Sequence, residues 1–224
     1  MTDQIARGRF ITLEGGEGAG KSTQAQRLAA HLRDRGFETV LTREPGGSPL
    51  AERIRGVILS GAVAPLGPAA EAVMFSAARI DHLEKTIRPA LARGAWVICD
   101  RFSDSTRAYQ GALGNLEPRF LRDLERVTIG ATRPDLTLVV DVPAEAGLAR
   151  ARARSSVVDR FEAEGLAFHE ALRKAFLDIA AGEPERCAII DGSGDADAVE
   201  ASVWAVVEQR LFGGGAKPET GDAA

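Results

Sequence analysis

Residues 9–23, which read RFITLEGGEGAGKST, most strongly constrain what this chain can fold into. The pattern G-x-x-x-x-G-K-[ST] of a phosphate-binding loop runs from Gly15 to Ser22. Residues 10–13 before it form a short apolar run typical of a buried strand, and residues 23–35 after it place apolar side chains at helical spacing. A glycine-rich turn between a strand and a helix directs backbone N–H groups and the helix N-terminus at an anion. We therefore expect a nucleoside triphosphate site rather than a chance glycine-rich turn.

The residues of this loop have distinct expected tasks. Glycine lets the backbone adopt positive φ and approach a phosphate closely. The Lys21 side chain is expected to reach the terminal phosphates and to be catalytic, and the Ser22 hydroxyl is expected to bind Mg²⁺. The expected nucleotide-binding residues are Gly15, Gly16, Glu17, Gly18, Ala19, Gly20, Lys21, Ser22 and Thr23.

Beyond the loop, the chain alternates short apolar runs with helical patterns. The runs expected as strands are residues 10–13, 38–42, 95–99, 135–140 and 187–190. The stretches expected as helices are residues 23–35, 49–59, 68–93, 118–129, 143–154, 161–181 and 196–211. Because the strands are continuously apolar and separated by helices, they should be parallel and covered on both faces. We predict an α/β fold with a five-stranded parallel sheet flanked by helices.

Length and composition limit the organisation of the chain. With 224 residues, of which 45% are hydrophobic, it should form one domain over residues 1–212, followed by a Gly- and charge-rich tail over residues 213–224 that is expected to be disordered. A net charge of −4 creates no basic field, so nucleic acid is not an expected partner. Cys99 and Cys187 both lie in apolar runs, which indicates core residues in a reduced compartment rather than a disulfide or a metal pair.

No segment of the sequence predicts export or membrane insertion. Residues 1–8 are polar and lack the apolar centre of a signal peptide. No apolar stretch approaches the ~20 residues that span a bilayer. We expect a cytoplasmic protein without a membrane partner.

Phosphate-binding loops occur in kinases, GTPase switches, motors and transport ATPases, so the remaining sequence has to discriminate among them. A guanine-reading N-K-x-D motif requires an asparagine, and the only one is Asn115, in an unrelated context. Residues 191–194 match a D-x-x-G switch pattern, but they follow the last strand, which is the wrong order for a GTPase. The chain is also too short to carry a motor's lever. These observations favour a small kinase that acts on a small molecule.

Two residues at the end of the third expected strand are candidates for the acceptor site. Asp100 closes the apolar run and could hold Mg²⁺ or its water shell, so Ser22 and Asp100 are the expected metal ligands. An aspartate that only caps the following turn is an equally common arrangement. Arg101 follows at the same sheet edge, where a guanidinium can bind a phosphate with two hydrogen bonds.

Ordered segments of the sequence resemble the thymidylate kinase family. They are EGGEGAGKST (residues 14–23), TREPGG (42–47), FSAAR (75–79), DRFSDSTRAYQG (100–111) and PDLTL (134–138). The similarity is colinear from about residue 9 to 165 and weak beyond. It implies a P-loop NTPase fold with a mobile lid, and transfer of a phosphoryl group from Mg-ATP to dTMP, giving ADP and dTDP in dTTP biosynthesis. It also implies a homodimer.

The resemblance assigns the thymine base to one helix face. Phe75 and Arg79 stand four residues apart, so both side chains can meet one ligand. In the family, such a phenylalanine stacks on thymine and such an arginine donates to its O4. Without the resemblance, core packing would be the preferred interpretation of Phe75, and Arg79 could form a solvated ion pair with a neighbour such as Asp81.

Further substrate contacts follow from the same resemblance. Tyr109 and Gln110 would line the deoxyribose and the base, and the tyrosine ring would exclude a ribose 2′-hydroxyl, although core packing is open for a lone tyrosine. Ser105 and Thr106 would contact the base, with helix capping as the alternative. A carboxylate at Glu17 is unfavourable beside phosphates unless it has its own task, and the family's task is to accept the 3′-hydroxyl. The alternative is a side chain that points to solvent.

Arg101 would hold the phosphate of dTMP, and Arg43 could assist; Pro45 lies in the same turn. An arginine in a turn is more often simply exposed, and the sequence leaves open whether Pro45 follows a cis peptide bond. The expected substrate-binding residues are Glu17, Arg43, Pro45, Phe75, Arg79, Arg101, Ser105, Thr106, Tyr109 and Gln110.

Phosphoryl transfer requires cations around the moving group, and residues 16–19 of the phosphate loop contain no arginine. An arginine-rich segment resembles the lid of the bacterial-type enzymes, and we place the lid at about residues 143–162. Like charges so close repel each other, which favours a segment that orders only over ATP; a solvated basic helix face is the alternative. The expected catalytic residues are Lys21, Arg101, Arg150, Arg152, Arg154 and Arg160, with Arg154 as first choice among the lid arginines.

Two other functions stay open at this level. One is another nucleoside monophosphate or deoxynucleoside kinase, which would not need the combination of Phe75, Arg79, Tyr109 and Gln110. The other is a nucleotide-dependent regulatory protein, which would turn over slowly and show no dependence on an acceptor.

Overall fold

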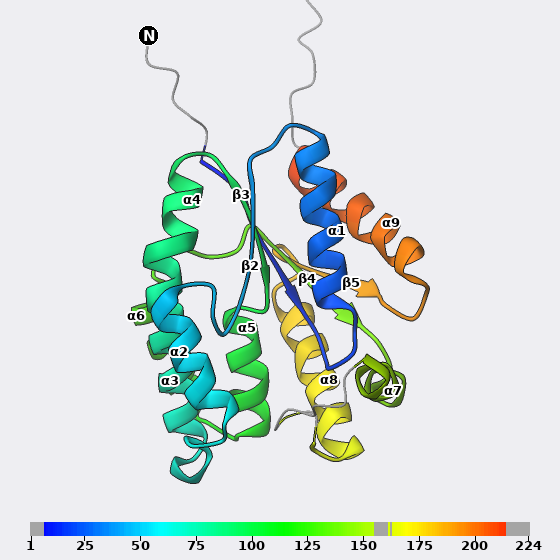
Figure 1. Ribbon diagram of the computed structural model, residues 1–224. Coiled ribbons are helices and arrows are strands. Elements are labelled where there is room, and N and C mark those ends of the chain that lie inside the picture. Colours follow the sequence, from blue (N-terminus) through cyan, green and yellow to red (C-terminus); the bar gives the residue numbers. More distant parts are fainter. Residues whose placement is uncertain (1–6, 155–160, 162, 214–224) are drawn as a thin grey trace, which may run out of the picture.

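A computed structural model of the chain describes residues 7–154, 161 and 163–213 (Figure 1). One parallel sheet with the strand order β2-β3-β1-β4-β5 forms its centre. The strands are β1 Phe10–Glu14, β2 Thr39–Arg43, β3 Trp96–Asp100, β4 Leu136–Asp141 and β5 Cys187–Asp191. The predicted five-stranded parallel α/β fold is therefore confirmed. Each strand begins within one residue of its expected start, because continuous apolar runs mark buried strands reliably.

Helices connect successive strands and cover both faces of the sheet. They are α1 Lys21–Asp34, α2 Pro49–Leu59, α3 Pro68–His82, α4 Arg88–Ala92, α5 Ser103–Thr106, α6 Pro118–Ile129, α7 Ala144–Arg154, α8 Leu166–Gly182 and α9 Ala196–Val207. Short π-helical segments follow α3, α5 and α9, at Leu83–Ile87, Arg107–Leu113 and Glu208–Phe212. Among the described residues, none of these helices combines the length and apolarity needed to cross a bilayer.

Two layers of apolar side chains hold the helices on the sheet. On one face, Leu28 and Leu32 of α1 and Val203 of α9 pack against Ile11 and Leu13 of β1. The opposite face is divided between a cluster under α4 and its preceding π-helical segment and a cluster under α8. Figure 1 shows α1 and α9 together on one side of the sheet, with α2, α3, α4 and α6 grouped on the other.

The strand register brings polar residues to one edge of the sheet. Leu13 of β1 lies opposite Asp100 of β3, and Arg43 of β2 lies opposite Asp100 from the other side. The phosphate loop begins directly after β1, so the carboxyl ends of β1, β2 and β3 converge beside it. In open α/β sheets, this is the edge at which ligands bind.

Two helix predictions need correction. The helix expected over residues 68–93 is continuous but widens into a π-helical turn at Leu83–Ile87, just before Pro89, whose missing N–H cannot complete a regular α-helical ladder. The helix expected from residue 161 begins only at Leu166, with Gly165 as its N-cap. Most of the predicted lid beyond Arg154, and the predicted tail beyond Gly213, lie outside the described residues.

Candidate nucleotide site

The phosphate loop lies between β1 and α1, as the motif predicts. Gly15, Gly18 and Gly20 all adopt positive φ. A Cβ on Gly18 would overlap the carbonyl oxygen of Gly147, so only glycine allows the loop to pack against α7. The Lys21 Nζ donates to the Gly16 carbonyl oxygen over 2.6 Å, which folds the side chain back over the loop. Because α1 begins at Lys21, its free N–H groups point toward the loop interior.

The two predicted metal ligands contact each other. The Ser22 hydroxyl donates to Oδ2 of Asp100. Oδ1 of Asp100 is buried and has no hydrogen-bond partner in the part of the chain that the structure describes. A partnerless carboxylate oxygen beside a hydroxyl fits a hard cation. Among the described residues, no group of three or more His, Cys, Asp or Glu side chains could hold a metal, so an ion here would take most of its ligands from phosphate oxygens and water.

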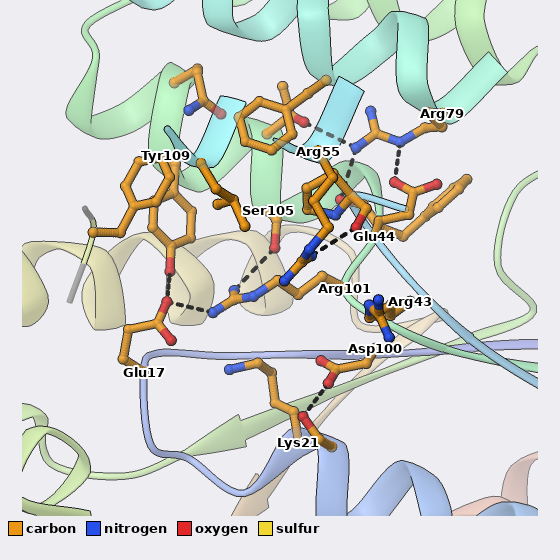
Figure 2. A pocket seen from close by; sticks show the side chains of 18 of the residues that line it. Glu17, Lys21, Arg43, Glu44, Arg55, Arg79, Asp100, Arg101, Ser105 and Tyr109 are labelled. Carbon is orange, nitrogen blue, oxygen red and sulfur yellow. Dashed lines mark hydrogen bonds and ion pairs between the residues drawn. The ribbon is translucent and has the colours of Figure 1, made fainter. Parts of the chain in front are cut away.

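A second hydrogen-bonded group lines the cavity beside the phosphate loop (Figure 2). It consists of Arg101, Glu17 and Tyr109. Nη2 of Arg101 donates to Glu17 Oε1 over 2.7 Å, and the Tyr109 hydroxyl donates to the same oxygen over 2.6 Å. Nη1 of Arg101 also reaches the Gly15 carbonyl and the Ser105 hydroxyl, each over 3.2 Å. Arg101 itself has a φ of 68° immediately after β3, a rare backbone conformation that turns its side chain toward the phosphate loop.

These contacts decide the charge states of the site. Burial would raise the pKa of the Glu17 carboxyl, but the positive charges of Arg101 and Lys21 outweigh it and lower that pKa to about 2. Glu17 is therefore a carboxylate at neutral pH, and its side chain is 14% exposed, so the alternative in which it points to solvent is wrong. Burial and the nearby Arg101 charge lower the pKa of Lys21 to about 8, against the opposing effect of Glu17, Asp100 and Glu14.

One cavity is lined by every residue predicted to bind substrate and by both predicted metal ligands. Those residues are Glu17, Arg43, Pro45, Phe75, Arg79, Arg101, Ser105, Thr106, Tyr109 and Gln110, together with Ser22 and Asp100. They come from the phosphate loop, the turn after β2, α3, the end of β3 and α5 with its π-helical extension. The fold thus joins segments that are far apart in the sequence. Glu44, Arg55, Leu59, Phe102 and Phe161 also line the cavity and were not predicted.

Phe75 and Arg79, the two predicted base contacts on α3, line one wall of this cavity. Phe75 is half-buried. Arg79 is only 4% exposed, and its Nε donates to Glu44 over 2.7 Å. Its Nη2 donates to the Phe102 carbonyl and to the Thr106 hydroxyl. The solvated pair with Asp81 that the sequence allowed is therefore wrong: Asp81 accepts instead from Ser48.

Other predicted residues have specific partners. Nε2 of Gln110 donates to Glu71 over 3.2 Å. Arg43 is 56% exposed and pairs with Glu52, so its side chain reaches the rim of the cavity rather than its interior. The peptide bond between Glu44 and Pro45 is cis.

Glu14 is a site residue that the sequence reasoning missed. It ends β1 fully buried and accepts from the backbone N–H groups of Phe102 and Ser105, at 2.7 and 3.3 Å, and from the Ser105 hydroxyl at 2.7 Å. This carboxylate caps the first turn of α5, which has no cap of its own, so the capping alternative for Ser105 is wrong. Burial and the charge of Asp104 raise the pKa of Glu14 to about 7. Its only sequence signal is an acidic residue at the end of an apolar strand.

The lid arginines lie apart from this cavity as far as they are described. Arg150 of α7 donates to the carbonyl oxygens of Gly192 and Ser193, at 2.8 and 3.1 Å, and lines a second cavity that shares Gly18 and Gly20 with the first. Arg152 is exposed. The Arg154 side chain and the whole of Arg160 lie outside the described residues. Thr23 and Ala19 of the phosphate loop also line the second cavity.

Comparison with known proteins identifies the family of this chain. A model of the family "Thymidylate kinase" matches residues 13–203, which extends well beyond the similarity seen in the motifs. Thymidylate kinases of Bradyrhizobium sp. (strain BTAi1) and Nitrobacter winogradskyi are each 56% identical to it over 92% of this chain, and the matches cover 92% and 90% of those proteins. The crystal structure of thymidylate kinase from Ehrlichia chaffeensis superposes with a TM-score of 0.73 at 34% identity, covering 90% of this chain and 99% of that one. The chain belongs to the thymidylate kinase family.

Proposed function

We propose that this chain transfers the γ-phosphoryl group of ATP to dTMP, giving ADP and dTDP in dTTP biosynthesis, with Mg²⁺ bound to the phosphates. The observation that carries the proposal is the single cavity that runs from Lys21 and Ser22 of the phosphate loop to Phe75 and Arg79 of α3. A phosphate donor and a pyrimidine acceptor can therefore occupy adjoining parts of one site. Kinases of this kind act mainly by positioning and charge neutralisation.

On the donor side, Lys21 and the phosphate loop bind the ATP phosphates. Ser22 and Asp100 would hold Mg²⁺, which would supply charge neutralisation at the phosphates. The partnerless Oδ1 of Asp100 supports this assignment, as does the direct Ser22–Asp100 contact. A bound polyphosphate beside Lys21 would also favour its protonated form, because an adjacent anion raises the pKa of an ammonium group.

On the acceptor side, Arg101 holds the phosphate of dTMP and Glu17 accepts the 3′-hydroxyl of its sugar. Glu17 is suited to accept because it remains ionised at neutral pH. Tyr109, hydrogen-bonded to Glu17, borders the sugar and leaves no room for a 2′-hydroxyl. The acceptor phosphate needs no general base, since its second pKa of about 6 makes it a dianion near pH 7.

The thymine base stacks on Phe75 and accepts a hydrogen bond from Arg79, with Thr106 and Gln110 beside it. The turn residues Arg43 and Pro45 border the same cavity and close it on the β2 side. The lid arginines Arg150, Arg152, Arg154 and Arg160 approach the transferring phosphoryl group when ATP is bound, and the closed lid keeps water from competing as acceptor.

The chain functions as a homodimer in this proposal, because three helices on one side of the sheet each expose a pair of apolar side chains. Leu50 and Val57 on α2, Val73 and Ile80 on α3, and Phe120 and Val127 on α6 are each seven residues apart and between 37% and 71% exposed. These helices lie together on one side of the sheet (Figure 1). An apolar face that spans neighbouring helices is typical of an interface rather than of a free surface. A second copy of the chain covers it.

A direct test compares ADP release from Mg-ATP with dTMP, dUMP, dCMP, AMP or no acceptor. We expect release that depends strongly on dTMP. A preference for AMP or dCMP would instead indicate another nucleotide kinase, and release indifferent to every acceptor would indicate a regulatory nucleotide-binding protein.

The acceptor role of Arg101 is tested by Arg101→Ala. Loss of two charge-assisted hydrogen bonds predicts a kcat/KM for dTMP roughly 10²- to 10⁴-fold lower, while the KM for ATP stays within a few fold. Arg93→Ala is the matched control, because Arg93 forms an exposed ion pair with Glu38 away from the cavity. An unchanged KM for dTMP in Arg101→Ala would remove Arg101 from this role.

A further inference from the structure

A chain of hydrogen bonds behind the base side of the cavity links the turn after β2 to α3. The Glu44 carboxylate accepts from Nε of Arg79 at 2.7 Å through one oxygen and lies 3.0 Å from Nδ1 of His82 through the other. Nε2 of the same imidazole lies 2.7 Å from the Thr42 hydroxyl. The Arg79 and His82 side chains are 4% and 0% exposed, and Glu44 is 5% exposed.

We propose that Glu44 is a positioning residue for base selection, which holds the Arg79 guanidinium in the one orientation that offers an N–H donor to a carbonyl at position 4 of a pyrimidine. The inference rests on the proposed base site at Phe75 and Arg79. Thymine and uracil carry an oxygen at this position, whereas cytosine carries an amino donor. A donor held rigidly therefore selects against cytosine, because two donors would be forced together in a buried site.

The contacts of Arg79 fix the plane of its guanidinium. Nε is bound by Glu44, and Nη2 is shared between the Phe102 carbonyl at 3.2 Å and the Thr106 hydroxyl at 3.1 Å. Among the described residues, Nη1 has no hydrogen-bond partner, so its N–H groups remain for a ligand. Glu44 also lies within the lining of the cavity, and Figure 2 shows its carboxylate directly beside Arg79.

His82 prevents the Glu44 carboxylate from turning away. A carboxylate held at one oxygen can rotate about its last bond, but a second anchor at the other oxygen removes that freedom. His82 is itself pinned by Thr42 and by the turn: a Cβ on Gly47, whose φ is 81°, would overlap both the imidazole and the Thr42 hydroxyl. The Thr86 hydroxyl also donates to the Gly47 carbonyl at 2.7 Å. The backbone on both sides of Glu44 is thus attached to α3 and to the π-helical segment that follows it.

Glu44 also compensates the positive charge of the buried Arg79. A buried guanidinium is unfavourable unless a carboxylate accompanies it. Glu52, a carboxylate of α2 near the same turn, is already engaged, because it pairs with Arg43 and accepts from the Gly47 N–H. Glu44 is therefore the carboxylate that keeps Arg79 buried, oriented and compensated before any substrate arrives.

The test is a double-mutant cycle between Glu44→Gln and Arg79→Ala, with kcat/KM measured for dTMP, dUMP and dCMP. In the native background, Glu44→Gln should lower kcat/KM for dTMP and for dUMP by roughly 10- to 100-fold and leave dCMP nearly unchanged. The ratio of kcat/KM for dTMP to kcat/KM for dUMP should therefore stay constant, whereas the ratio of kcat/KM for dTMP to kcat/KM for dCMP should fall. In the Arg79→Ala background, Glu44→Gln should change these values by less than about 2-fold, because it acts through Arg79.

Equal losses in both backgrounds, or equal losses for dTMP and dCMP, would overturn the proposal and leave Glu44 a purely structural role. The matched control is Glu84→Gln, because Glu84 is an exposed glutamate on the π-helical segment after α3. If Glu44→Gln does not fold, His82→Gln serves in its place, because it keeps the Glu44–Arg79 pair and removes only the second anchor. His82→Gln should show the same selective loss of kcat/KM for dTMP and dUMP, but a smaller one. A native chain that does not prefer dTMP would refute the proposed function itself, which separates the two failures.

Discussion

Glu14 should make the stability of this chain fall as the pH rises from about 4.5 to 7. Its carboxyl is fully buried at the end of β1, where burial and the neighbouring charge of Asp104 raise its pKa from 4.5 to about 7, against the opposing effect of Arg101. Between these two pH values, the folded chain holds a proton that the unfolded chain has lost. The free energy of unfolding therefore decreases with increasing pH across this window.

The size of the effect follows from the two pKa values. One pKa unit corresponds to about 1.4 kcal/mol, so the rise from 4.5 to about 7 removes about 3 kcal/mol of stability once Glu14 is ionised. Glu14→Gln cannot titrate and lacks this decrease. Glu17 acts in the opposite sense: its lowered pKa of about 2 gives stability that is present above pH 4.5 and lost as the pH falls toward 2. Because Glu17 titrates below the window and is present in both proteins, it does not enter their difference.

The assay is urea unfolding of the native chain and Glu14→Gln at pH 5, 6, 7 and 8. At pH 5 the variant should be about as stable as the native chain, because the protonated Glu14 carboxyl, like glutamine, accepts both backbone N–H groups through one oxygen and turns its other group toward the Ser105 hydroxyl. Its stability relative to the native chain should then improve by about 2.5 kcal/mol by pH 8, because pH 5 already lies above the unfolded pKa. A difference in unfolding free energy that stays constant from pH 5 to pH 8 would refute the reasoning.

Further predictions concern the phosphate loop and the apolar helical face. Lys21→Ala should nearly abolish turnover with the fold intact, because the buried Lys21 ammonium is the cation with which the phosphate loop binds the ATP phosphates. Steady-state rates and circular dichroism check this, with Lys174→Ala on the surface of α8 as control. A wild-type turnover rate in Lys21→Ala would contradict the proposed mechanism. Ser22→Ala should raise the Mg²⁺ concentration needed for half-maximal rate by about 10-fold or more, since it removes a direct ligand, and an unchanged Mg²⁺ titration would contradict that role. Ile80→Glu should convert a dimer to a monomer in sedimentation, because it places a charge in the apolar face of α3, and an unaltered sedimentation coefficient would place the interface elsewhere.

Local patterns in the sequence were sufficient for the fold. The strand, glycine-rich turn and helix around Gly15 to Ser22 were predictable because backbone conformation there depends on neighbouring residues, through apolar periodicity and glycine at positive φ. The helix itself begins at Lys21, two residues before the expected start. Continuous apolar runs likewise identified every strand of the sheet. The predicted substrate-binding residues were carried by motifs rather than by periodicity, and the fold brings them to one cavity because parallel strands end at a common edge.

Only the tertiary structure decided which buried charges face each other. The sequence left open a solvated ion pair between Arg79 and a neighbour such as Asp81, whereas the partner is Glu44, 35 residues upstream. Glu14 similarly holds α5 across 88 residues, with no local signal beyond an acidic strand end. An ion pair inside a protein depends on which segments fold together and on how much water they exclude, and neither quantity can be read from sequence neighbours. The sequence by itself therefore determined the sheet, the phosphate loop and the candidate residues, and the packing of distant segments determined how those residues are held and charged.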